Sequence, residues 1–215
     1  LHSFPARRSS DLTSFSVPAG IALSLATDGN FRLINITLNS TCTGSILGTV
    51  NIYSNGFGGT GTFINSGNLT IGSAGVITDG TNNSAFTLSA GATLQIGSAA
   101  GITTTGTTGN IQVGGTRTYT AGANYIYNGV ASQAVGNGLT QNTPASITIS
   151  NPGNTVTLGA NTTMTGTLTV NAGSTLALGG STLGSPTSLV MYDGASSNPG
   201  SSITGTGTLT LGGNV

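Results

Sequence analysis

Short runs of alternating apolar and polar residues recur along the chain, and turn residues separate them. A typical run places an apolar, a polar and an apolar residue in succession, as in Leu94, Gln95 and Ile96. Alternation with a period of two is typical of a β-strand with one buried face. Other clear runs lie at residues 69–71, 111–113, 147–149, 156–158, 168–170, 176–178 and 209–211. The pattern therefore predicts a chain of many short strands.

The spacing of these runs indicates how the strands are arranged. Neighbouring runs in the later part of the chain are roughly 8–12 residues apart, and every second run recurs after roughly 20 residues, as from Val156 to Leu176. That interval suits one coil of a solenoid whose coils stack and share one apolar column. We therefore expect an all-β fold, a parallel β-helix (β-solenoid) with roughly 20-residue coils, over residues 13–215 as a single unit. The rhythm breaks near 114–144, where we expect a longer coil or a protruding loop.

Composition narrows the function. Only 4% of the residues are charged and the net charge is zero, whereas ordinary domains carry about 25% charged residues. A neutral chain lacks the electrostatic footprint of a nucleic-acid-binding protein, so we expect no nucleic-acid partner. A transmembrane helix needs about 18 consecutive apolar residues, and the sequence has no such run, so we expect no membrane insertion of this segment.

Residues 1–12 differ chemically from the rest. They read LHSFPARRSSDL and hold the only histidine and half of the basic residues. From His2 onward they resemble the translation of a common sequencing adapter, HSFPTRRSSDL, with Ala6 in place of threonine. We therefore treat residues 1–12 as a non-native segment and expect the chain to be a fragment.

The remaining residues offer little catalytic chemistry. From Thr13 onward the sequence has no histidine, lysine or glutamate. Asp28, Asp79 and Asp193 each precede glycine, a dipeptide typical of turns. Cys42 is the only cysteine, so it forms no internal disulfide and belongs to no Cys/His metal motif. We expect no enzyme activity, no catalytic residue, no cofactor and no metal.

Three tyrosines are the weak candidates for contact with a partner. Tyr125 and Tyr127 alternate and share one side of an expected strand, and Tyr119 is close in sequence. Exposed tyrosine rings can stack on sugars or contact a protein. The alternative is that the three rings pack beneath a loop.

The stretch from Tyr119 to Leu139, together with SITISNPGNTVTLGANTTMTGTLTVNAGSTLALGG after it, resembles β-strand-repeat surface proteins of Gram-negative bacteria. The resemblance covers most of residues 59–215. It implies an extracellular or cell-surface location and a structural or adhesive, autotransporter-like passenger role. It also implies a signal peptide upstream and a secretion or anchoring domain downstream. The partner is an unknown surface, glycan or protein, and no catalytic residue carries over from the repeats.

Two further expectations concern surfaces. The alternative to a structural or adhesive role is an ice-binding or glycan-binding solenoid module. Thr-x-Thr pairs such as Thr155 and Thr157 recur and suggest the ice-binding form, while the tyrosines suggest the glycan-binding form. Ice binding requires such pairs in register on several consecutive coils. The strand edges exposed at the ends of a solenoid also favour end-to-end self-association. Light scattering of the isolated chain should then show larger species than a monomer, and a uniform monomer would contradict this.

Overall fold

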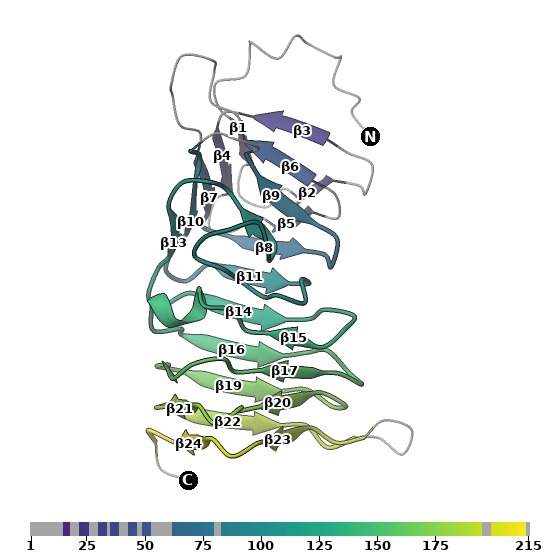
Figure 1. Cartoon of the computed structure of the whole chain (residues 1–215), viewed down its shortest axis with the longest axis vertical. Coiled ribbons are helices and arrows are strands. Elements are labelled where there is room, and N and C mark those ends of the chain that lie inside the picture. The colour runs from purple at the N-terminus through teal and green to yellow at the C-terminus, as the bar shows by residue number, and fades with distance from the viewer. Residues whose placement is uncertain are drawn as a thin grey trace.

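A computed structural model shows an all-β chain in which parallel strands stack into a β-solenoid, which confirms the predicted fold class. It describes residues 62–79, 83–194 and 199–213 in full, together with the backbone of six strands between residues 15 and 52. Residues 1–12, Asp28 and Cys42 lie outside this description. The fully described residues make about six turns, with coils about 23 residues apart. Figure 1 shows the strands stacked along the long axis of the molecule.

One parallel sheet, here called sheet B, runs along the whole stack. In order it contains β2 (Ala22–Leu25), β5 (Thr43–Ile46), β8 (Asn68–Ile71), β11 (Thr93–Ile96), β14 (Asn124–Tyr127), β16 (Ser146–Ile149), β19 (Thr167–Val170) and β22 (Ser188–Met191). Because each coil contributes one strand to it, this sheet sets the register of the coils.

Four shorter parallel sheets complete the coils. Sheet A contains β1 (Phe15–Val17), β4 (Asn35–Leu38), β7 (Thr62–Asn65), β10 (Ala85–Leu88) and β13 (Arg117–Tyr119), and sheet C contains β3 (Asn30–Leu33), β6 (Thr49–Ile52), β9 (Val76–Thr78) and β12 (Ile111–Gln112). Sheet D contains β15 (Gln133–Ala134), β17 (Thr155–Thr157), β20 (Thr175–Ala177) and β23 (Ser202–Thr204), and sheet E contains β18 (Thr162–Thr163), β21 (Thr182–Gly184) and β24 (Thr208–Thr210).

The core is a set of apolar columns inside the coils. In sheet B, Leu94 is in register with Leu69 on one side and Tyr125 on the other, and Ile147 pairs with Leu168 farther along. All of these side chains are buried. The alternating strands place every second residue inside, and stacking lets each coil cover the apolar side chains of the next. This explains how a chain with so few charges and helix formers folds.

The core is less covered in the last described coil. Leu189, Ile203 and Leu209 point toward the core but are only partly buried. Met191 and Tyr192 are exposed there.

Coil length varies more than the sequence suggested. Toward the C-terminus the register offset in sheet B is 21 residues, as between Ile147 and Leu168, close to the predicted interval of about 20. It is 25 between Asn68 and Thr93, and 31 between Thr93 and Asn124. The longest coil is longer because it contains an extra loop, residues 103–109, between β11 and β12.

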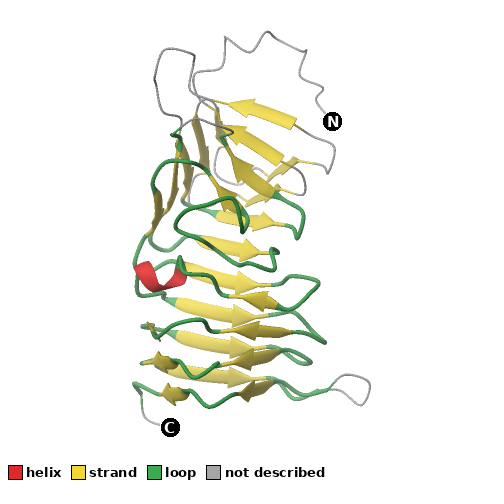
Figure 2. Ribbon diagram, viewed as in Figure 1, coloured by secondary structure: helices red, strands yellow, loops and turns green. Residues whose placement is uncertain are grey.

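The architecture changes around this long coil. Sheets A and C end at β13 and β12, while sheets D and E begin at β15 and β18. Before the extra loop the chain passes beneath β15, where Ala134 N donates to Ala99 O and Ile102 N donates to Val135 O. A short 3-10 helix, η1 (Leu139–Gln141), follows β15 with Leu139 buried, and it is red in Figure 2. We call residues 99–142 the junction.

Residues 114–144, where we expect a longer coil or a protruding loop, overlap the end of the longest coil, which runs from Thr93 to Asn124. Residues 114–144 hold β13, β14 and β15 as well as η1, and they continue the stack. The protruding loop lies upstream, at residues 103–109. The turn-rich letters of 114–144 suggested a loop because its strands are only two to four residues long.

Candidate functional site

The junction brings the three candidate tyrosines together inside the solenoid. Tyr119 comes from β13, and Tyr125 and Tyr127 come from β14. Their exposed fractions are 2%, 0% and 0%, so all three are core residues and cannot contact a partner from outside. This corrects the exposed position considered from the sequence, because the alternation of β14 points both of its rings inward. The ring of Tyr119 also packs on Phe86, with centroids 5.9 Å apart.

Each tyrosine hydroxyl meets a polar group at the junction. Tyr119 Oη donates to Thr103 O at 3.1 Å, and Tyr127 Oη donates to Val135 O at 2.9 Å. Tyr125 Oη accepts from Asn142 Nδ2 at 2.9 Å, and the same amide donates to the backbone oxygen of Tyr119. Buried carbonyls without partners are costly. The three rings therefore fill the interior of this coil, while the hydroxyls of Tyr119 and Tyr127 pair with backbone oxygens and that of Tyr125 pairs with the side chain of Asn142.

Burial perturbs the ionisation of all three phenols. Removal from water raises the pKa of Tyr119 above its ordinary value, and the nearby Arg117 only partly opposes this. Burial likewise raises the pKa of Tyr125, against a smaller lowering by the hydrogen bond from Asn142. It raises the pKa of Tyr127 as well, with Tyr125 and Tyr119 adding to the effect. The neutral phenol is therefore the form compatible with the fold.

We expect these tyrosines to make the fold sensitive to alkali. Their pKa values are about 10 in the unfolded chain and higher in the folded chain, so the unfolded state loses its protons first as pH rises. Their contribution to stability is fully present below about pH 10 and declines above it, by about 1.4 kcal/mol per pH unit for each tyrosine. Urea unfolding between pH 8 and 11 measures this slope.

The matched variant for this measurement is Tyr127→Phe, which removes one titrating group. It should reduce the alkaline slope by about a third, although it also loses the hydrogen bond to Val135. A slope unchanged by the substitution would contradict the assignment to the buried phenols.

Arg117 is a structural residue that the sequence did not single out. It is in register with Phe86 and is only 3% exposed. Its Nε donates to Val113 O at 3.0 Å, its Nη1 to Thr103 Oγ1 at 2.7 Å and to Thr103 O at 3.3 Å, and its Nη2 to Val113 O and to Gly106 O. A guanidinium has five N–H donors, so the protein itself occupies them all. The sequence does show that Arg117 and Tyr119, two residues apart, lie on the same side of a strand. A buried Tyr119 therefore implies that Arg117 also points into the core.

Burial lowers the pKa of Arg117, while the nearby Tyr119 and Asp79 act in the opposite direction. Asp79 is itself fully buried, and its Oδ2 accepts from Ser84 N at 2.7 Å and from Gly114 N at 2.9 Å. Its role as a turn residue after β9 therefore includes holding two backbone amides. Asp193 is exposed and is the remaining charged side chain of the fully described residues.

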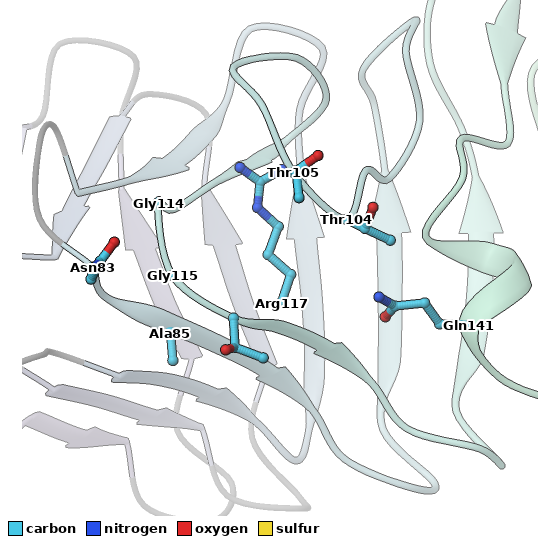
Figure 3. A pocket seen from close by; sticks show the side chains of 9 residues that line it. Asn83, Ala85, Thr104, Thr105, Gly114, Gly115, Arg117 and Gln141 are labelled. Carbon is cyan, nitrogen blue, oxygen red and sulfur yellow. The ribbon is translucent and has the colours of Figure 1, made fainter.

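A surface notch lies between the extra loop and sheet A. It has a volume of about 670 Å³ and is lined by Asn83, Ala85, Thr104, Thr105, residues 114–117 and Gln141. Figure 3 shows the Arg117 side chain extending beside the part of the extra loop that carries Thr104 and Thr105. Gln141 lies across the opening. The notch exists because the loop rises over the starts of β10 and β13. Its residues are distant in sequence and of types common throughout this chain, so no sequence pattern predicts the notch.

A second surface feature is the outer face of sheet B. Asn68, Thr93, Asn124, Ser146, Thr167 and Ser188 occupy one outward register column, and Ser146 Oγ bonds Asn124 Oδ1 at 2.7 Å. Complete Thr-x-Thr pairs do not repeat on consecutive strands of this face: β19 has Thr167 and Thr169, but β22 has Ser188 and Val190. The register that ice binding would require is therefore not present on sheet B.

The part of the chain that the structure describes contains no helix long and apolar enough to cross a membrane. Within the same residues there is no group of three or more His, Cys, Asp or Glu side chains that could hold a metal ion.

Comparison with known proteins gives no relative. No family model, no curated protein and no solved structure matches this chain. Its function must therefore be argued from its own geometry.

Proposed function

We propose that this chain is a structural or adhesive segment of a secreted, cell-surface repeat protein, without catalytic activity. The observation that supports it best is the in-register stacking of eight strands in sheet B, which produces an elongated body with a repeated outer face (Figure 1). A stack of coils gives a long surface from little sequence information. Such a body suits display or spacing at a cell surface.

The side chains with the most reactive chemistry support the same proposal. Arg117 uses its donors on backbone and threonine oxygens. The hydroxyls of the three junction tyrosines are engaged within the fold. Groups held in this way serve packing, and their pKa shifts have structural causes. The buried arginine and tyrosines therefore stabilise the stacked coils of the solenoid.

Labelling of whole cells tests the surface location. Antibodies raised against the purified segment should bind intact cells that express the gene, and brief protease treatment of those cells should remove the signal. Labelling that appears only after permeabilisation would contradict surface display. An antibody against a cytoplasmic protein provides the control for intact cells.

The adhesive part of the proposal has its own readout. Monovalent antibody fragments against the segment should reduce attachment of these cells to their substratum. If the antibodies label the cell surface but do not reduce attachment, the adhesive role is contradicted and the structural role remains.

A further inference from the structure

The notch beside the extra loop has the size of a ligand site. Its volume of about 670 Å³ is within the range of about 300–1,000 Å³ typical of small-molecule pockets. Its walls come from three separate parts of the chain: the start of β10, the start of β13 with the glycines before it, and the extra loop, with η1 across the opening (Figure 3). The core fixes these parts, since Phe86 on β10 and Leu139 on η1 are fully buried.

The charged groups near the notch already have hydrogen-bond partners within the protein. Arg117 lines the notch, but its five N–H donors are directed at Val113, Thr103 and Gly106. Asp79 is fully buried, and its carboxylate accepts from the backbone amides of Ser84 and of Gly114, which lines the notch. An anionic ligand would find no free guanidinium donor, and a cationic one would find no exposed carboxylate on this wall. The geometry favours an uncharged ligand.

The rim, in contrast, offers free hydrogen-bonding groups. Asn83 and Gln141 are exposed amides on opposite sides of the opening, and Thr105 and Thr116 add exposed hydroxyls. Within the described residues, these four side chains make no hydrogen bond. An amide provides both donors and an acceptor, and a hydroxyl can act as either. Ala85, Gly114 and Gly115 carry at most a methyl group, and we call this part of the lining the floor.

We propose that this notch binds a neutral saccharide, one or two pyranose units of an uncharged glycan. Sugar hydroxyls both donate and accept, which matches the rim amides and threonines, and the flat C–H face of a pyranose suits a floor of alanine and glycine. This names a ligand for the adhesive role proposed above and rests on it. Binding by the purified chain is measured separately from cell attachment, so failure of one is distinguishable from failure of the other.

A glycan array with neutral and anionic members, followed by calorimetry on the best neutral oligosaccharide, tests the proposal. At least one neutral glycan should bind, with an affinity that changes less than about twofold between 50 and 500 mM NaCl, because no free charge takes part. Ala85→Leu should weaken binding at least about tenfold by filling the floor. Thr87→Leu, on the same strand and the same outward side but outside the notch, should leave it unchanged.

A second variant keeps the test independent of folding at position 85. Asn83→Ala combined with Gln141→Ala removes both rim amides and should also weaken binding at least about tenfold, while the thermal unfolding midpoint stays within a few degrees. Three outcomes would overturn the proposal: no neutral glycan bound, binding confined to anionic glycans with strong salt dependence, or equal affinity in wild type and both notch variants.

Discussion

Replacing Arg117 with methionine should lower the free energy of unfolding by about 3–5 kcal/mol, the cost of removing one partner from a buried polar and charged cluster. The substitution would leave the oxygens of Val113 and Gly106 without the guanidinium that now binds them. It would also leave the buried Asp79 carboxylate without the nearby positive charge. Urea unfolding followed by far-ultraviolet circular dichroism measures the loss.

The neighbouring residue provides the matched control for Arg117. Thr118 is exposed on the outer side of the same strand, so Thr118→Met should change the stability by no more than about 0.5 kcal/mol. Arg117→Lys should lose most of what Arg117→Met loses, because a single ammonium cannot reproduce the guanidinium fork. If Arg117→Met were as stable as the Thr118→Met control, the hydrogen bonds of Arg117 to Val113, Thr103 and Gly106 would not stabilise the fold.

A comparable loss is expected from a single added methyl group at Gly136. The residue has φ of +81°, where an L side chain is strained, and a Cβ there would lie 2.0 Å from Ile102 O. The strain alone costs about 1–2 kcal/mol. The clash is with backbone that cannot rotate away, so Gly136→Ala should cost about 4 kcal/mol or more, or prevent folding.

Two other glycines serve as controls that separate the backbone strain at Gly136 from the steric clash of its added Cβ. Gly91 has φ of +76° but open space around its Cβ position, so Gly91→Ala should show the strain alone, about 1 kcal/mol. Gly159 has open space and no positive φ, so Gly159→Ala should be neutral or stabilising by up to about 1 kcal/mol. We expect the thermal unfolding midpoint to be highest for Gly159→Ala, lower for Gly91→Ala and lowest for Gly136→Ala. Equal midpoints for the last two would show that the junction can yield to a Cβ.

The solenoid was predictable from the sequence because its signal is local and repeated. Alternation in runs such as Leu168, Thr169 and Val170 specifies which side chains face inward, and the recurrence after about 20 residues specifies stacking. The junction lacked such a signal. Its coil is longer through an inserted loop of threonine and glycine, letters that also make up ordinary turns in this chain, so neither its position nor its contacts follow from periodicity.

The candidate residues illustrate the same limit. Alternation correctly placed Tyr125 and Tyr127 on one side of a strand, but period two does not say which side is inside. The burial of Arg117 depends on oxygens supplied by Thr103, Gly106 and Val113, and only the fold brings this set together. The notch joins residues from positions 83 to 141, a separation that no local pattern encodes.

The exchange of sheets at the junction has a mechanical consequence. Sheets A and C serve one end of the body and sheets D and E the other, and sheet B is the sheet, among the strands described, that has members on both sides. Tension along the axis therefore crosses this point through the ladder of sheet B and a few backbone hydrogen bonds between residues 99–102 and 134–138, supported by the side-chain bonds of Arg117 and the tyrosines. Under load, we expect the rod to unfold first at residues 99–142, while the stacked coils on either side stay folded.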